Sequence, residues 1–137
     1  MNSFIPEDKI LLSQTFSLPD APPPAAGYSP VVSRGPLLAI SGQVPFLPGR
    51  LQGPVPEIRE QARTVFAYLV RLLETAGGAV SDVLVVRVYL AREQDFSVMN
   101  EVFDEVFGKV RPARTTVWVN LPGGLLIEAD VLAVTGS

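Results

Sequence analysis

The chain has 137 residues, of which 47% are hydrophobic and 18% are charged, and its formal net charge at pH 7 is −3. This composition is typical of a globular protein, and the length allows one domain with a sizeable core. We therefore expect residues 1–137 to form a single domain, with residues 1–18 as an extended N-terminal arm. A mildly acidic chain without a basic block lacks the charge pattern of a nucleic-acid-binding protein.

The sequence contains neither histidine nor cysteine. Thiol catalysis, Ser-His-Asp triads, disulfides and the usual zinc sites, including those of zinc deaminases, are therefore excluded. No cluster of carboxylates indicates a magnesium site, so we expect no metal and no other cofactor. An enzyme of this composition must rely on arginine, lysine, tyrosine, hydroxyl groups, carboxylates, the backbone and water.

The N-terminal residues MNSFIPEDKI lack a basic start followed by an apolar block, so we expect no signal peptide. No apolar run reaches the length of about 18 residues that a membrane-spanning helix needs. These two observations predict a cytoplasmic protein without a membrane partner.

Proline dominates the first part of the chain, where ten of the 13 prolines lie between Pro19 and Pro56. Because proline fixes φ and removes a backbone donor, we expect extended segments and turns here. The predicted elements are an irregular arm over 1–26 with a short strand near 10–12, a β-hairpin over 30–43 that turns at 34–36, and a loop over 44–56.

Two amphipathic helices are predicted in the middle of the chain. The first lies between Pro56 and Gly78, and its apolar residues recur at intervals of three and four. They are Ile58, Ala62, Val65, Leu69, Leu72 and Ala76. The second follows Asp95 as N-cap and ends at Gly108. Its apolar face is formed by Phe96, Met99, Phe103 and Val106.

Three further strands are predicted over 81–91, 114–121 and 125–134, where β-branched and apolar residues are frequent. A Leu-Pro-Gly-Gly turn joins the last two and predicts a hairpin. The whole order predicts an α+β fold with both helices on one face of the sheet. Alternation along 114–121 places Trp118 on the helix-free face, so we expect another subunit to cover that face.

Arg114 and Glu128 are the main candidates for chemistry. Arg114 opens a strand, where its guanidinium would either bind a carboxylate with two parallel hydrogen bonds or form a weak surface ion pair. Glu128 lies in an apolar strand, where it would either orient a water and take its proton or face solvent. Counting from Gly123 places Glu128 opposite residues 117–119, so the two side chains would flank a small ligand rather than pair.

Weaker candidates lie elsewhere. Tyr28 would stack on or hydrogen-bond a ligand, or pack its loop onto the core. Ser41 and Gly42 end a strand, where their backbone would approach a small anion or form an ordinary turn. Asn100 faces away from the apolar stripe of the second helix, at the surface or in a site. Arg87 interrupts an apolar strand and is interpreted as an interface or salt-bridge residue.

Six short motifs occur in a particular order: Gly-Tyr-Ser (27–29), Ser-Gly-Gln-Val-Pro (41–45), Ala-Gly-Gly (76–78), Phe-x-x-Met-Asn-Glu-Val-Phe (96–103), Pro-Ala-Arg-Thr-Thr-Val (112–117) and Leu-x-Glu-Ala (126–129). Over roughly residues 19–135 this pattern resembles the Rid (YjgF-like) family of reactive-intermediate imine deaminases. The motif around Arg114 is the most specific part of the resemblance.

The resemblance implies a chorismate-mutase-like mixed β-sheet, a homotrimer with three ligand clefts between subunits, and metal-independent hydrolysis of small 2-imino acids to 2-oxo acids and ammonia. It places the carboxylate-binding arginine of the family on Arg114 and the catalytic carboxylate on Glu128. The family's other ligand-binding positions fall on Tyr28, Ser41, Gly42, Asn100 and Thr116.

The chain also departs from the family pattern. Its loop 27–30 lacks the usual proline and glutamine, and Trp118 replaces a charged or small polar residue, which leaves room for a bulkier substrate. A non-catalytic protein that binds small carboxylates such as 2-oxo acids is the alternative function, since fold does not fix function. The presence of Glu128 beside Arg114 favours the enzyme. A ribonuclease is disfavoured by the acidic composition and by the lack of an aromatic and basic platform.

Overall fold

The structure, a computed structural model, describes residues 12–136. Its elements in chain order are β1 (Ser13–Phe16), β2 (Val31–Arg34), β3 (Leu37–Gln43), α2 (Ile58–Thr75), η1 (Val80–Asp82), β4 (Val83–Leu90), η2 (Glu93–Asp95), α3 (Phe96–Phe107), β5 (Ala113–Trp118) and β6 (Ile127–Val134). The short elements η1 and η2 are single 3₁₀ turns that precede β4 and α3.

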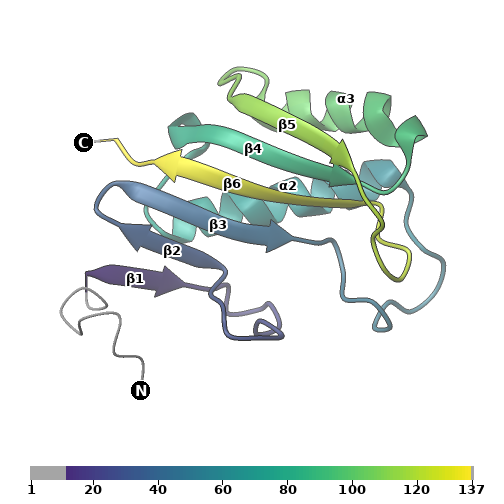
Figure 1. Ribbon diagram of the computed structural model, residues 1–137, viewed down its shortest axis with the longest axis horizontal. Coiled ribbons are helices and arrows are strands. Elements are labelled where there is room, and N and C mark those ends of the chain that lie inside the picture. Colours follow the sequence, from purple (N-terminus) through teal and green to yellow (C-terminus); the bar gives the residue numbers. More distant parts are fainter. Residues whose placement is uncertain (1–11, 137) are drawn as a thin grey trace.

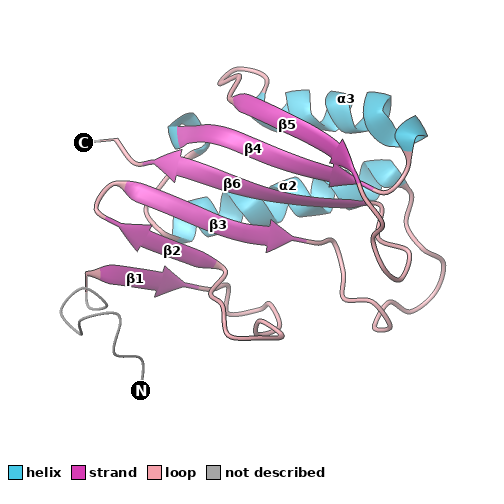
Figure 2. Cartoon of the chain, in the orientation of Figure 1, coloured by secondary structure: helices cyan, strands magenta, loops and turns pink. Residues whose placement is uncertain are grey.

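The strands form one six-stranded sheet in the order β1-β2-β3-β6-β4-β5, and both helices lie on one of its faces (Figures 1 and 2). Neighbouring strands are antiparallel except β4 and β5, which run parallel because α3 forms the crossover between them. The predicted α+β fold, with a mixed sheet and helices on one face, is confirmed.

Periodicity predicted the two helices well. The apolar stripe of α2 is buried at Ile58, Ala62 and Val65, and Gly108 follows α3 as expected. Asp95 occupies the N-cap position of α3, as predicted, but its side chain makes no capping hydrogen bond. Its two carboxylate oxygens accept hydrogen bonds from Arg92 at 2.8 Å each, because a carboxylate this buried needs a charged donor.

The core lies between the helices and the sheet. Three phenylalanines pack edge-on or tilted at its centre: the Phe66 ring centroid is 5.7 Å from those of Phe103 and Phe107, which are 4.8 Å from each other. The sheet contributes alternate residues of its two central strands, which are fully or almost fully buried: Val86, Val88, Leu90, Ile127, Ala129, Val131 and Ala133. The residues between them consequently face away from the helices.

The predicted hairpin of the last two strands is wrong. Strand β6 lies between β3 and β4, so that β4 separates it from β5, and Glu128 lies opposite Tyr89 instead of residues 117–119. The turn itself forms, since Gly123 and Gly124 have φ of 59° and 82°. A turn motif does not specify which strand is paired next. Strand β6 carries the more apolar core face and takes a central position, whereas the polar β5 takes the edge.

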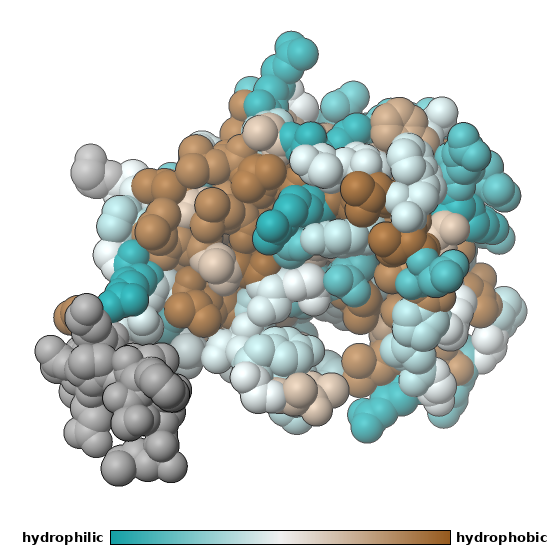
Figure 3. Space-filling model, in the orientation of Figure 1, coloured by the Kyte–Doolittle hydropathy of each residue, from teal (hydrophilic) through white to brown (hydrophobic). Residues whose placement is uncertain are grey.

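Trp118 also lies on the opposite face from the one predicted. Its ring centroid is 5.8 Å from that of Phe96 in α3, so it points to the helix-bearing side of the sheet. The helix-free face is nevertheless apolar, as Figure 3 shows over the ends of β3, β4 and β6. Its exposed apolar side chains are Val32, Leu37, Leu84, Val117 and Leu132.

The N-terminal region is more regular than predicted. The short strand expected near 10–12 falls largely outside the described residues, but β1 at 13–16 pairs with β2. Within residues 12–136, no helix combines the length and the apolar character that crossing a membrane would require.

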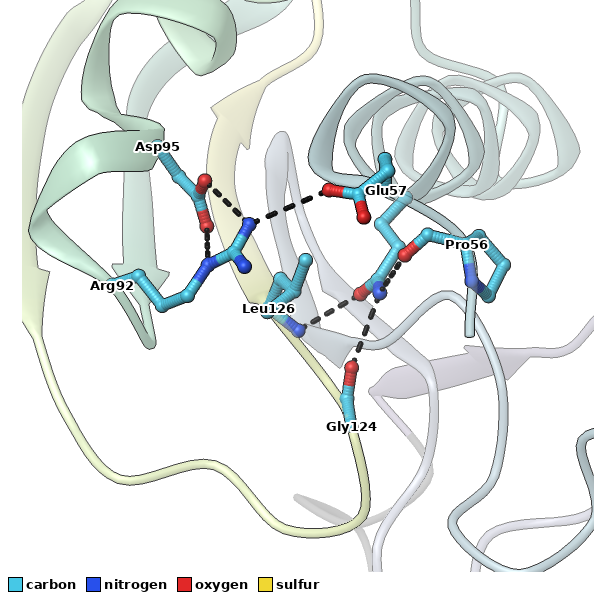
Figure 4. Close-up of polar contacts among 7 residues, drawn as sticks. Pro56, Glu57, Arg92, Asp95, Gly124 and Leu126 are labelled. Atoms are coloured by element: carbon cyan, nitrogen blue, oxygen red, sulfur yellow. Dashed lines mark hydrogen bonds and ion pairs between the residues drawn. The ribbon is translucent and has the colours of Figure 1, made fainter. Parts of the chain in front are cut away.

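Gln61 links the start of α2 to the segment that leads into β6. Its side chain is 1% exposed. Its Nε2 donates to the carbonyl oxygens of Pro56 at 2.8 Å and Gly124 at 3.1 Å, and its Oε1 accepts from the amide of Leu126 at 2.8 Å (Figure 4). These three hydrogen bonds join the start of α2 to the segment that leads into β6, the strand that carries Glu128.

We predict that Gln61→Met destabilises the protein by about 3 kcal/mol, because it leaves buried backbone groups without partners. Urea unfolding at equal protein concentration measures the change. The control Ala67→Met, at an exposed position of the same helix, should cost less than about 0.5 kcal/mol. Equal effects of the two substitutions would contradict the role assigned to Gln61.

Candidate functional site

Arg114 lies on β5 with its guanidinium against α3. Its Nη2 donates to Asn100 Oδ1 at 2.7 Å, its Nη1 lies 3.8 Å from Met99 Sδ, and its Cζ is 4.7 Å from the ring centroid of Phe103. Phe103 lies one turn after Met99 and Asn100 on the same side of α3, which is why the three residues can surround one side chain. The guanidinium is thereby fixed by a hydrogen bond and by a cation–π contact.

The electrostatic setting of Arg114 favours an anionic ligand. Burial lowers the pKa of Arg114, while the charge of Asp104 raises it to a smaller extent, and the group stays protonated at neutral pH. No carboxylate within residues 12–136 forms an ion pair with it. It borders an open groove of about 690 Å³ that also includes residues 111–112. A planar, protonated guanidinium without an ion-pair partner suits a carboxylate ligand.

Thr116 follows Arg114 on the same side of β5. Its Oγ1 is buried and has no hydrogen-bond partner in the part of the chain that the structure describes. Buried hydroxyl groups are usually satisfied, so this orphan next to a half-buried guanidinium marks the β5 edge as a place where a further polar group is needed.

Glu128 lies on the helix-free face of β6, close to β3. A Cβ added to Gly42 would lie 2.5 Å from Glu128 Oε2, so the carboxylate lies directly against the backbone of Gly42, and a larger residue there would displace it. The register between β3 and β6 shifts in the same place, between Ile40 and Gln43. Burial raises the pKa of Glu128, and the nearby charge of Asp130 raises it further. In residues 12–136 its carboxylate accepts no hydrogen bond from another side chain.

The loop that carries Tyr28 is attached to β3 through Ser41. The hydroxyl of Ser41 donates to the carbonyl oxygen of Ser29 at 2.7 Å, and its amide donates to that of Pro30 at 2.9 Å. Tyr28 is 54% exposed. Together with Gly42 it lines a cleft of about 450 Å³, seen in Figure 3 as an opening between the loops that follow β1 and β3.

A polar cluster beside Glu128 was not predicted. The Asp130 carboxylate accepts from Arg87 Nε at 2.6 Å and from the Tyr89 hydroxyl at 2.8 Å, and the residue is 8% exposed. The hydrogen bond to Asp130 is the main reason that the pKa of Tyr89 is raised. The interpretation of Arg87 as a salt-bridge residue is consistent with this pair. Only the pairing of Arg87 with Asp130 across β4 and β6 reveals the cluster, and the hairpin predicted from the sequence paired β6 with β5 instead.

The candidate residues form two separate groups within one chain. Arg114 lies opposite Val86 and Glu128 opposite Tyr89, on the two sides of β4. Two strand spacings amount to about 10 Å, and the two side chains point to opposite faces of the sheet. Arg114, Asn100 and Thr116 lie on the helix-bearing side. Glu128 lies on the helix-free side of β6, against Gly42 of β3. Tyr28 and Gly42 line the cleft that also includes Tyr68 of α2, and Ser41 holds the loop of Tyr28. One chain cannot bring both groups to one ligand of a few atoms.

In the described part of the chain, no three Asp or Glu side chains gather where they would hold a metal ion. The charged side chains of the two groups of candidate residues are the guanidinium of Arg114 and the carboxylate of Glu128. They suit an organic anion and a water molecule better than a cation.

Comparison with known proteins identifies the family. The sequence model of the family described as Endoribonuclease L-PSP matches residues 18–135. A RutC family protein of Pyrococcus horikoshii is 40% identical over 115 residues, which cover 83% of this chain and 91% of that protein. This chain belongs to the Rid (YjgF, RutC) family. The resemblance inferred from the motifs is confirmed.

Rid proteins of known function and structure are among its relatives. The 2-iminobutanoate/2-iminopropanoate deaminase of Dermatophagoides farinae is 32% identical over 87% of this chain and 94% of its own length. The crystal structure of RidA from the Antarctic bacterium Psychrobacter sp. PAMC 21119 has a TM-score of 0.77 at 34% identity, over 88% of this chain and 98% of that one. The fold is therefore that of the Rid family, which includes imine deaminases.

The raised pKa of Glu128 gives a prediction about stability. A carboxylate whose pKa is higher in the folded state makes the fold less stable as pH rises from its unfolded-state pKa to its folded-state pKa, and the full cost is present above the latter. We predict that Glu128→Gln melts at a higher temperature than wild type at neutral pH. The gain should disappear as pH falls below about 4, the ordinary pKa of glutamate, because Glu128 is then protonated in both the folded and the unfolded state. Thermal melts across this pH range measure it. Exposed Glu74→Gln serves as control, and a lower melting temperature for Glu128→Gln at neutral pH would contradict the prediction.

Proposed function

We propose that this Rid protein is a hydrolytic deaminase of small 2-imino acids, such as 2-iminopropanoate and 2-iminobutanoate, and that it acts as a homotrimer with sites between copies. One observation carries the proposal. A guanidinium without a protein carboxylate and a carboxylate without a hydrogen-bonding side chain lie on opposite faces of the sheet. An imino acid provides the anion for Arg114, and its hydrolysis provides the water for Glu128. The name of the Dermatophagoides relative supports this substrate class.

Two copies are needed to assemble such a site. In the proposed trimer, the β5 edge and α3 of one copy face the β3 and β6 region of the next. The exposed apolar side chains of the helix-free face support this arrangement, because monomeric proteins rarely leave a large apolar patch uncovered (Figure 3). Repetition of one head-to-tail contact around a threefold axis closes the ring.

The chemistry follows from the two groups. Arg114 binds the carboxylate of the imino acid through its remaining N–H donors and so fixes the imine carbon. Glu128 accepts a proton from a water, which adds through oxygen to that carbon, with the backbone near Thr116 helping to orient it. Glu128 returns this proton to the imine nitrogen, which gives a carbinolamine. The hydroxyl proton of the carbinolamine then passes to nitrogen as the C–N bond breaks, so that ammonia leaves and a 2-oxo acid remains. The raised pKa of Glu128 makes it a better proton acceptor. Imines hydrolyse unaided in water, so positioning and charge need supply only a few kcal/mol.

A small-carboxylate binding protein of the same fold is the alternative. Such a protein needs Arg114, but it gains nothing from a half-buried carboxylate with a raised pKa. The state of Glu128 therefore favours catalysis. The endoribonuclease description of the family raises RNA as another substrate, but a net charge of −3 provides no overall attraction for a polyanion.

We predict that Arg114→Ala lowers imine hydrolysis by about 100-fold or more, because the substrate loses both its anchor and its orientation. An amino-acid oxidase generates 2-iminopropanoate in the presence of semicarbazide, and the fraction of imine diverted from this trap measures the rate. Arg71→Ala, which breaks an exposed ion pair with Asp20, is the matched control and should retain full activity.

Wild-type rates in Arg114→Ala, with assembly and circular dichroism unchanged, would exclude this role of the arginine. If the wild-type protein diverts no imine but binds 2-oxobutanoate in an Arg114-dependent way, the binding protein is the better account.

A further inference from the structure

Two exposed aromatic rings meet beside the Arg114 side chain. Trp118 at the end of β5 is 48% exposed, and Phe96 at the start of α3 is 36% exposed. Their ring centroids are 5.8 Å apart with an angle of 40° between the planes. We call this pair the aromatic shelf. It joins two elements at the open edge of the sheet, where each ring leaves a large apolar surface uncovered.

The shelf continues from the carboxylate-binding group. The Cζ atom of Arg114 lies 5.7 Å from the centroid of the Phe96 ring. Arg114, Thr116 and Trp118 are alternate residues of β5 and therefore share one side of the strand, about 7 Å apart from one to the next. Guanidinium, orphan hydroxyl and aromatic shelf thus form a continuous row along the strand and the facing helix.

We propose that the aromatic shelf binds the side chain of the imino acid whose carboxylate Arg114 holds, and that it selects 2-imino acids with aromatic or large aliphatic side chains over 2-iminopropanoate. This inference rests on the proposed function. In a 2-imino acid the carboxylate and the side chain are attached to the same imine carbon. A ring carried on that side chain therefore lies within a few ångströms of the carboxylate, and the shelf begins at this distance from the guanidinium.

The physical gain comes from ring contacts and from removal of apolar surface from water. Offset or tilted aromatic pairs contribute binding free energy beyond that of the area they bury. A good apolar subsite discriminates between a larger and a smaller substrate side chain by about tenfold or more. A methyl side chain is too short to reach the shelf and gains nothing from it. The preference should therefore appear in kcat/KM for large imines and leave small imines unaffected.

The kinetic test compares imines that an amino-acid oxidase makes from phenylalanine, leucine and alanine. Wild-type protein should prefer the phenylalanine imine to the alanine imine by about tenfold. Trp118→Gln should remove that preference and change kcat/KM for the alanine imine by less than about twofold. Trp118→Phe keeps an aromatic ring and should keep most of the preference. No preference in the wild type, or the same preference in Trp118→Gln, would overturn the inference while leaving the deaminase itself intact.

A binding test is independent of catalysis. Trp118 is the only tryptophan of the chain, so tryptophan emission reports on the shelf alone. Titration with 3-phenylpropanoate should shift the emission to the blue and give about tenfold tighter binding than propanoate. Arg114→Ala should weaken both acids. Equal binding of the two acids with unchanged emission would overturn the inference even if no imine were hydrolysed.

The assembly state decides between a ligand subsite and a packing contact. Sedimentation of Trp118→Gln should show the same oligomer as wild type. Dissociation of the oligomer in this variant would mean that the rings pack between copies, and the inference would then be wrong.

Discussion

Every side chain of the single sheet points either toward the two helices or away from them, and this alternation governs how the candidate site can be built. Arg114 is one of the alternate residues of β5 whose side chains face α3, where Asn100 and Phe103 hold its guanidinium. Glu128 points to the helix-free face of the sheet, because its neighbours on β6, Ile127 and Ala129, are buried in the core on the other face. No rotamer change moves either group across the sheet. Under the proposed function, a catalytic pair of these residues therefore requires two copies of the chain.

The distribution of satisfied and unsatisfied polar groups supports the same account. Asp95 is held by Arg92, Asp130 by Arg87 and Tyr89, and Gln61 by three backbone groups, so buried polar atoms away from the candidate site have partners. Within residues 12–136, the one buried side-chain polar atom left without a partner is the hydroxyl of Thr116. The carboxylate of Glu128 is only half-buried, but burial is sufficient to raise its pKa. Proteins rarely leave buried polar groups unpaired without a functional reason. Both groups belong to the candidate site, and a bound ligand together with a second copy of the chain would provide the missing partners.

Much of this could be predicted from the sequence, because periodicity and residue type are local. The spacing of apolar residues predicted α2 and α3 closely. A guanidinium at the start of a strand and a carboxylate within an apolar strand identified Arg114 and Glu128 as candidates. The errors concern pairing over long range. A turn at Gly123 and Gly124 does not reveal that β6 inserts between β3 and β4, so the partner of Glu128 was mispredicted. Trp118 was assigned to the wrong face because parity depends on which residues of β5 meet α3. The Asp130 cluster depends on the same register.

Complementation between two inactive variants tests the central claim most directly. Arg114→Ala and Glu128→Gln each remove one half of the site, and co-expression of the two chains produces mixed trimers. If the site lies between copies, random mixing gives about one quarter of sites both intact halves, and imine hydrolysis should recover to about that fraction of the wild-type rate. Recovery in the mixture, with each variant alone inactive, is the predicted result. A mixture no more active than its two parents would contradict the account, since it would mean that one chain supplies both groups.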